Sequence, residues 1–184
     1  LVHREVLRRD GLRFTGKRAP DEQESHFLRS TDNWFRPTMV RTGPDGALWI
    51  ADMYRFVIEH PEYISDDIEA RLDLRAGHDK GRIYRVVSTH RPGRSIARLD
   101  QLATPELVAR LDSPNGVERD RVQALLDWRN DKTAVTPLEQ LAANAERPIV
   151  RAQALWTLKL LGGLDDDRIR AALADHDPRV QAQA

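Results

Sequence analysis

The sequence contains no cysteine, no long apolar run and no excess of charge of either sign. Without cysteine the chain has no disulfide, thiolate nucleophile or zinc–thiolate site, and it cannot attach a c-type haem covalently. No apolar segment approaches the roughly 20 residues that a membrane-spanning helix needs. The 29 basic and 29 acidic residues cancel, whereas a surface that binds nucleic acid usually needs a basic excess. We therefore expect no nucleic-acid partner.

The remaining composition is that of a globular protein. Of the 184 residues, 40% are hydrophobic and 32% are charged, and a chain of this length can form one domain or two small ones. The residue pattern changes near residues 88–95. We expect an antiparallel β part in residues 1–90, a linker over residues 91–103 and a helical part in residues 104–184.

The β part shows turn residues between strand-like runs. The apolar residues 47–51 follow the turn sequence Gly-Pro-Asp-Gly at residues 43–46, which predicts a central strand after a tight turn. A second strand is predicted over residues 81–87. The polar residues 61–74 between them predict a loop with one or two helical turns. A hairpin is predicted over residues 2–15.

The helical part marks its helix ends with proline and glycine. Four helix starts are predicted, three of them with a capping residue before the proline: Thr104-Pro105, Thr136-Pro137, Arg147-Pro148 and Asp177-Pro178. Gly162-Gly163 predicts a helix end. The acidic residues 165–167 are expected to stabilise a helix N-terminus.

These helices repeat at an interval of 30 residues. Residues 121–125, 151–155 and 181–184 read RVQAL, RAQAL and QAQA. A fixed interval between helix pairs is typical of an α-solenoid, and this one resembles the short bacterial form of the HEAT repeat. We expect Gln123 and Gln153 to lie on the same face of their helices, and Trp128 and Trp156 to lie in the core.

The two ends of the chain predict a piece of a longer protein. The chain opens at Leu1 without an initiator methionine or a signal-peptide pattern, and residues 177–184 predict a helix that has just begun. We expect an internal or C-terminal fragment.

Three segments carry a resemblance to a known family. They read STDNWFRPTMV (residues 30–40), GPDGALWIADMYRFVIEHPEYI (residues 43–64) and RAGHDKGRIYRV (residues 75–86). In this order and followed by HEAT-like repeats, they resemble the membrane-bound dehydrogenase family of planctomycete and verrucomicrobial bacteria, whose β-propeller is similar to quinoprotein glucose and sorbosone dehydrogenases. The resemblance implies the last blade or blades of a propeller. It also implies a HEAT spacer leading toward a c-type cytochrome segment, and a periplasmic or membrane-associated location.

The resemblance further implies oxidation of a sugar or alcohol by pyrroloquinoline quinone with Ca²⁺, with electrons passing to a haem c. Such chemistry needs a base, cationic hydrogen-bond donors and a metal ligand. On that resemblance His60 is the candidate base, Arg36 and Arg55 are the donors, and Asp52 is the calcium ligand. Tyr54 and Arg55 follow Asp52 on the same cofactor-binding loop. Asp45 is expected to serve only the turn.

Two other interpretations stand beside the enzyme. The first is a non-catalytic propeller and HEAT scaffold that binds a protein or a polysaccharide. The second, a DNA-repair scaffold, is disfavoured by the neutral charge. Each candidate residue also has a structural alternative, because Tyr54 and Arg55 could tie loops together and His60 could be a packed loop histidine. Since one blade cannot assemble a propeller site, the piece alone is expected to be inactive.

Overall fold

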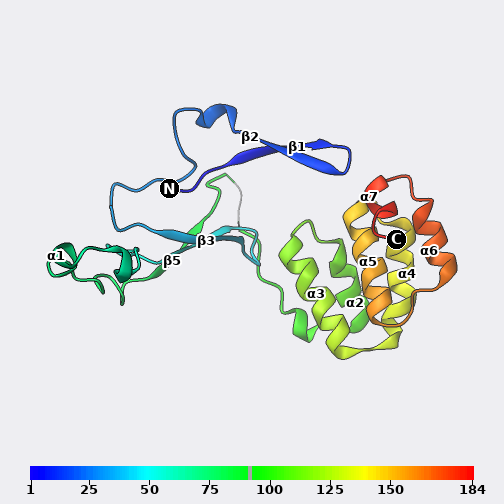
Figure 1. Ribbon diagram of the computed structural model, residues 1–184. Coiled ribbons are helices and arrows are strands. Elements are labelled where there is room, and N and C mark those ends of the chain that lie inside the picture. The colour runs from blue at the N-terminus through cyan, green and yellow to red at the C-terminus, as the bar shows by residue number, and fades with distance from the viewer. Residues whose placement is uncertain (91–92) are drawn as a thin grey trace. The chain divides into compact units, whose positions relative to one another are not determined.

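The structure is a computed structural model that describes residues 1–90 and 93–184. The chain divides into two units, Leu1–Gly93 and Arg94–Ala184. In the described residues, the first unit contains the strands and the second is almost wholly helical (Figure 1). The predicted combination of an antiparallel β part and a helical part is therefore confirmed. The predicted linker over residues 91–103 begins with Arg91 and Pro92, which lie outside the described residues.

The first unit contains two antiparallel sheets. A two-stranded hairpin is formed by β1 (Glu5–Asp10) and β2 (Arg13–Arg18), and a three-stranded sheet has the order β3-β4-β5. These strands are β3 (Pro37–Thr42), β4 (Leu48–Asp52) and β5 (Arg82–Val86). The predicted hairpin, central strand and third strand are all present. The described residues of this unit form no closed propeller.

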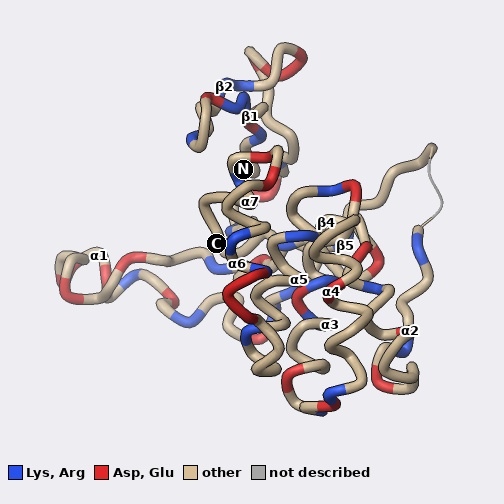
Figure 2. Tube along the Cα trace, turned by 90° about the vertical axis from the view of Figure 1, so that its right-hand side faces the viewer, with Lys and Arg blue, Asp and Glu red and all other residues tan. Residues whose placement is uncertain are grey.

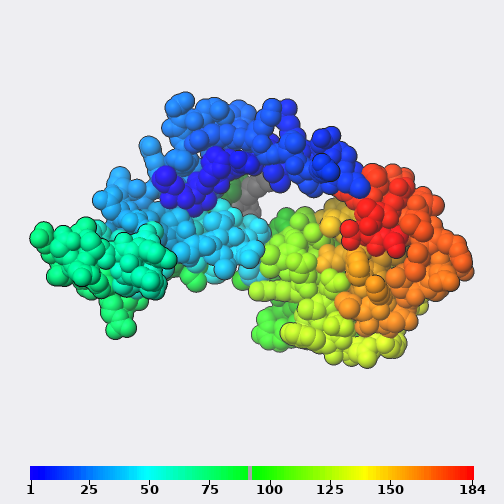
Figure 3. Space-filling view, viewed as in Figure 1, coloured from blue at the N-terminus to red at the C-terminus, as the bar shows by residue number. Residues whose placement is uncertain are grey.

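The polar segment between β4 and β5 contains two short helical elements. They are the 3₁₀ turn Pro61–Tyr63 and helix α1 (Asp66–Glu69). A further 3₁₀ turn, Pro20–Glu22, follows β2. The segment around α1 projects from the sheet (Figures 1 and 3).

The turn between β3 and β4 is built around a buried aspartate. The backbone N–H of Gly43 donates to the carbonyl of Ala47 at 2.8 Å, and Gly46 takes a positive φ of 79°. Asp45 Oδ1 accepts from the N–H of Ala47 and from Trp49 Nε1, both at 3.1 Å, and Oδ2 accepts from Arg85 Nε at 2.5 Å. Burial opposes the charge of Asp45, but these hydrogen bonds outweigh it and place the pKa of Asp45 below its usual value. Asp45 therefore ties the turn to β5 as well as shaping it.

The second unit is a stack of short helices. They are α2 (Thr104–Ala109), α3 (Gly116–Arg129), α4 (Val135–Asn144), α5 (Pro148–Leu160), α6 (Asp166–Leu173) and α7 (Pro178–Gln181). The 3₁₀ turns Leu99–Gln101, Arg110–Asp112 and Lys132–Ala134 precede or connect them. The core lies between α2, α3, α4 and α5, where Leu107, Leu126, Leu138 and Leu158 are at most 1% exposed. Leu99, from the segment predicted as linker, packs into the same core.

Two residues that are 30 positions apart in the sequence are in direct contact. Gln153 Nε2 donates to Gln123 Oε1 at 3.1 Å, so the two glutamines lie on facing positions of α5 and α3. Arg119 Nε donates to Gln153 Oε1 at 3.1 Å, and Gln153 Nε2 also reaches Asp120 Oδ1. The two glutamines therefore meet between α3 and α5, and their placement on the same face of equivalent helices stays a prediction.

Two of the four predicted helix starts are in place. Arg147 precedes α5 without a side-chain cap, and Asp177 precedes α7, where its side chain accepts from the N–H of Arg179. The other two starts were wrong by one or two residues. Thr104 is the first residue of α2 rather than its cap, and Thr136 lies inside the first turn of α4. The reason at α4 is that Ala134, at the end of a 3₁₀ turn, already has helical φ and ψ angles.

The prediction that both tryptophans lie in the core was also wrong. Trp128 is 79% exposed and Trp156 is 42% exposed. Val122 and Leu126, four residues apart, take the buried face of α3. Trp128 follows Leu126 by two residues, which places it on roughly the opposite side of the helix.

A buried ion pair joins α5 to the segment before α7. Arg151 is 3% exposed, and its Nε and Nη2 donate to the two carboxylate oxygens of Asp175 at 2.8 and 2.7 Å. Its Nη1 donates to the carbonyl of Ala145 at 2.7 Å. Hydrogen bonding from Arg151 holds the pKa of Asp175 below its usual value. Arg121, the repeat equivalent of Arg151, is exposed.

We predict that Arg151→Met destabilises the helical unit by about 3 kcal/mol, because it leaves the Asp175 carboxylate buried without its partner. Arg121→Met is the matched control and should change the free energy of unfolding by less than about 0.5 kcal/mol. Urea unfolding followed by circular dichroism measures both. Since the pKa of Asp175 is lowered in the folded state, the contribution is present at neutral pH and is lost as the pH falls below about 4. Equal stability of the two variants would contradict this assignment.

Candidate functional site

The three strands bring three chain segments to one end of the sheet. In the antiparallel register, Asp52 at the end of β4 lies opposite Pro37 at the start of β3 and opposite Arg82 at the start of β5. The residues before β3, after β4 and before β5 therefore meet at this end, which we call the sheet end. Of the candidate residues from the sequence, Arg36, Asp52 and Tyr54 are brought together there.

Asp52 organises the sheet end through one carboxylate oxygen. Its side chain is fully buried. Asp52 Oδ1 accepts from the backbone N–H of Arg36 at 2.7 Å and from that of Tyr54 at 2.9 Å. Oδ2 lies 3.8 Å from Arg82 Nε and has no hydrogen-bond partner among the described residues. One side chain thus fixes the chain entering β3 and the chain leaving β4.

Tyr54 has an unusual backbone conformation. Its φ is 50°, in the left-handed region that residues other than glycine rarely occupy. Gly77, with a φ of 85°, lies directly against it, because a Cβ on Gly77 would stand 2.2 Å from the carbonyl oxygen of Tyr54. The strained turn at Tyr54 therefore depends on the cap from Asp52 and on the missing side chain at Gly77.

The Tyr54 side chain is held on several sides. Its hydroxyl donates to Asp32 Oδ2 at 2.7 Å, and Arg82 Cζ lies 3.6 Å from the ring centroid. The hydrogen bond to Asp32 raises the pKa of Tyr54. The pKa of Asp32 is lowered, first by the hydrogen bond from the N–H of Trp34 and then by that from Tyr54. Tyr54 is therefore a neutral donor and Asp32 a charged acceptor at neutral pH.

The two candidate arginines use their side chains locally. Arg36 Nη1 donates to the carbonyl of Phe35 at 3.2 Å and also contacts the carbonyl of Asn33. Arg55 Nη2 donates to the carbonyl of Leu74 at 2.6 Å, which ties the projecting segment back to the loop after β4. In the described chain, both guanidinium groups bind backbone carbonyls.

His60 is not part of this arrangement. Its side chain is 69% exposed. Nδ1 accepts from the N–H of Glu62 at 3.3 Å, and the ring lies against Tyr63 with centroids 6.1 Å apart. The backbone of His60, the residue before Pro61, is extended, as the sequence predicts. Its visible role is to cap a 3₁₀ turn.

A calcium ion does not fit the described surroundings of Asp52. Calcium needs six to eight oxygen ligands. Asp52 Oδ1 is occupied by two N–H groups, Oδ2 is buried and faces a guanidinium group, and the described residues contain no group of three or more acidic or histidine side chains that could hold a metal. The assignment of Asp52 as a calcium ligand stays a prediction that would need ligands from outside these residues.

Charge and hydrophobicity give no sign of a nucleic-acid or membrane-spanning surface. Basic and acidic residues are interspersed along the helices (Figure 2). None of the helices in residues 1–90 and 93–184 has the length and apolar character needed to span a bilayer.

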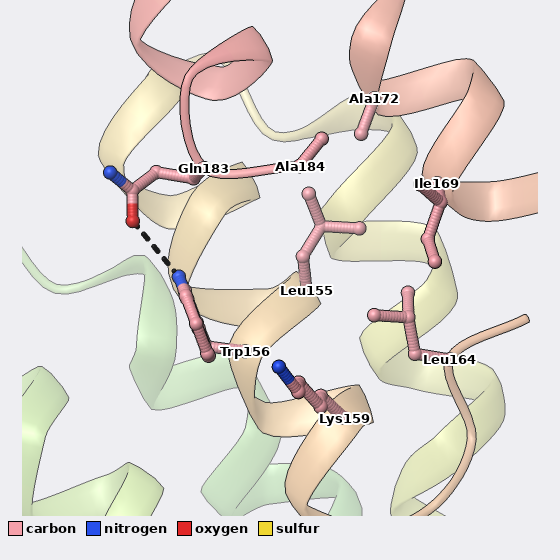
Figure 4. Close-up of a pocket in the computed structure, with 8 residues that line it drawn as sticks. All are labelled: Leu155, Trp156, Lys159, Leu164, Ile169, Ala172, Gln183 and Ala184. Carbon is pink, nitrogen blue, oxygen red and sulfur yellow. Dashed lines mark hydrogen bonds between the residues drawn. The ribbon is translucent and has the colours of Figure 1, made fainter.

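The second unit has an apolar pocket of about 250 Å³ (Figure 4). Its lining comes from α5, the segment between α5 and α6, α6 and the residues that follow α7: Leu155, Trp156, Lys159, Leu164, Ile169, Ala172, Gln183 and Ala184. Trp156 Nε1 donates to Gln183 Oε1 at 3.0 Å at its edge. The residues 30 positions before Trp156, Leu164 and Ala184 are Leu126, Ala134 and Ala154, and all three are buried in the main core. The pocket thus repeats a packing position of the main core, and its lining is apolar apart from Lys159 and Gln183.

Sequence reasoning missed two residues of the sheet end, Asp32 and Arg82. Asp32 lies in a resembling segment and could have been recognised as a turn residue, because its Oδ1 accepts from the N–H two residues later. Arg82 could not have been recognised, because its approach to Tyr54 and Asp52 depends on the pairing register of β4 with β5.

Comparison with known proteins gives one match. Residues 1–90 match the model of a family described as a domain of unknown function (DUF7133). No curated protein and no solved structure matches the chain. The match covers the β part of the chain.

We predict that Asp52→Ala destabilises the first unit by about 2 kcal/mol, because two backbone N–H groups lose their acceptor. Asp52→Asn keeps an oxygen in the Oδ1 position and should cost less than half as much. Thermal and urea unfolding of both variants measure the difference. If asparagine and alanine destabilise the protein equally, the cap at Oδ1 does not fix the sheet end.

Proposed function

We propose that this chain is the closing part of a propeller-type quinoprotein dehydrogenase that oxidises a sugar or alcohol, followed by a HEAT-like helical spacer. Within it, the sheet end serves to position loops at the mouth of the propeller. The reacting groups and the metal ligands come from other parts of the whole protein.

The observation that carries the proposal is the open three-stranded sheet. Both of its edge strands expose apolar side chains, with Met39 on β3 53% exposed and Ile83 on β5 66% exposed. A small sheet with open edges and uncovered apolar residues is poorly stable alone and prone to pair with other strands. Neighbouring blades of a propeller would cover these edges and faces.

The rigid sheet end supports the same proposal. Loops at one end of the strands form the binding mouth of a propeller, and the bonds that Asp52 accepts from Arg36 and Tyr54 fix two such loops relative to one another. In such an enzyme the substrate would lose two electrons and two protons to a bound quinone, becoming a carbonyl compound while the quinone becomes a quinol. A c-type cytochrome would then accept the electrons. No residue of this chain is assigned to that transfer.

The helical unit fits the role of a spacer. The hydrogen bond between Gln153 and Gln123, which are 30 residues apart, joins α5 to α3 across the intervening repeat interval. Stacked helix pairs of this kind extend a chain in one direction and present an extended surface. The proposed solenoid would separate the propeller from a cytochrome segment, in a protein located in the periplasm or at the outer side of the membrane.

A second candidate is a non-catalytic scaffold that binds a protein or polysaccharide. It is favoured by one observation, that the guanidinium groups of Arg36 and Arg55 already bind backbone carbonyls in the described chain. Cationic groups used in this way are less available to a quinone.

The deciding experiment is dye-linked oxidation of sugars and alcohols by the whole protein, reconstituted with pyrroloquinoline quinone and Ca²⁺. We predict turnover that requires both additions. Arg36→Ala and Arg55→Ala should each lower the rate by about 10-fold to 100-fold, because misplaced loops disturb the geometry of the site.

The control is Arg170→Ala, which removes an exposed arginine of the helical unit and should leave turnover unchanged. If the folded whole protein does not bind the quinone, the dehydrogenase proposal is wrong and the non-catalytic scaffold is the remaining candidate. Full activity of both sheet-end variants would show that this end of the sheet plays no part in the site.

A further inference from the structure

Three aromatic rings form a continuous strip at the sheet end. The centroid of Trp34 lies 5.7 Å from that of Tyr54 and 5.6 Å from that of Phe56, with interplanar angles of 49° and 37°. Trp34 is thus the centre of a curved strip that we call the aromatic strip. Its rings come from the segment before β3 and from the loop after β4.

The strip is held in place by hydrogen bonds and by close packing at its anchors. Tyr54 is held in a left-handed conformation by the Asp52 cap and by Gly77. The backbone N–H of Trp34 donates to Asp32 Oδ1 at 2.9 Å, while Asp32 Oδ2 holds the Tyr54 hydroxyl. A residue other than glycine at positive φ costs free energy, and such strain is concentrated at binding and catalytic sites.

The strip is also accessible. Phe56 is 46% exposed, Trp34 and Tyr54 are half-buried, and Asp32 is exposed. Most large aromatic side chains bury their faces in a core. Rings that are fixed in place and still meet solvent are suited to a ligand that packs on an aromatic face.

The polar groups beside the strip include both donors and acceptors. The Asp32 carboxylate oxygens each accept one hydrogen bond and have further lone pairs. Arg82, whose side chain is 39% exposed, lies over Tyr54 with its Nε bonded to the carbonyl of Lys80, and its remaining N–H groups can donate. A ligand for this surface needs an apolar face and hydroxyl groups around it.

We infer that the aromatic strip is a carbohydrate-binding surface, on which the C–H face of a pyranose ring packs while its hydroxyl groups bond to Asp32 and Arg82. This goes beyond the proposed dehydrogenase, since it involves no redox step and holds for non-reacting sugars of an oligosaccharide. A nucleic acid fits less well because the strip carries the Asp32 carboxylate. A lipid surface would not use the fixed donors and acceptors.

The test is a titration of this chain, labelled with ¹⁵N, against soluble hexasaccharides of β-1,4-linked glucose, xylose and mannose, with α-1,4-linked glucose as a further probe. The indole N–H resonance of Trp34 reports on the strip. We expect at least one of these saccharides to shift it saturably, with a Kd on the order of 1 mM or below.

Phe56→Ala should weaken that binding by about 10-fold, the effect of losing one aromatic contact, and Phe56→Tyr should restore it. The matched control is Phe14→Ala, the same change at an exposed phenylalanine of β2 that is 61% exposed, and it should leave the Kd unchanged. Circular dichroism verifies that each variant is folded.

The inference is overturned if none of the saccharides shifts the Trp34 resonance, or if Phe56→Ala and Phe14→Ala bind equally well. Because the titration needs no quinone, its failure is distinguishable from failure of the dehydrogenase. If the chain binds a saccharide but the whole protein oxidises none, the carbohydrate-binding strip is supported and the dehydrogenase is rejected. If the whole protein oxidises alcohols but the chain binds no saccharide, the dehydrogenase is supported and the carbohydrate-binding strip is rejected.

Discussion

The first unit depends on the two hydrogen bonds that Asp52 Oδ1 accepts. They join the residue before β3 to the second residue after β4, and the energy of this cap is large enough to hold Tyr54 in a conformation that would otherwise be unfavourable. The position of the Tyr54 ring in the aromatic strip and the bond from Tyr54 to Asp32 follow from that conformation. The carboxylate that the sequence offers as a calcium ligand organises the backbone around it, and its metal role stays a prediction.

The same constraint on the backbone gives the two candidate arginines of this segment a structural role rather than a direct contact with substrate. Arg36 and Arg55 have the charge that a quinone site requires, but in the described chain Arg36 binds the carbonyl of Phe35 and Arg55 binds that of Leu74. An arginine that fixes a loop can affect a reaction strongly without touching the substrate, since small displacements of a binding mouth are costly. Positioning is therefore the role that the geometry supports for this part of the protein.

The sequence predicted the elements better than their environments. Turn residues and periodicity located β4, β5, the hairpin and the paired glutamines, because these depend on local backbone preference and on a fixed interval. The surroundings of Trp128 and Arg151 could not be predicted, because a repeat fixes the position of a residue but not its neighbours. Arg151 meets Asp175 while its equivalent Arg121 is exposed. At the sheet end, Arg82 depended on a strand register that the sequence does not reveal.

The central claim is that Asp52 fixes the sheet end as part of the folded core. Residue-resolved amide hydrogen exchange of the unmodified chain tests it directly. The account predicts that the N–H groups of Arg36 and Tyr54 exchange as slowly as that of Ile50, the fully buried residue at the centre of β4. Exchange of those two N–H groups at the rate of an unprotected loop, with Ile50 still protected, would contradict the account.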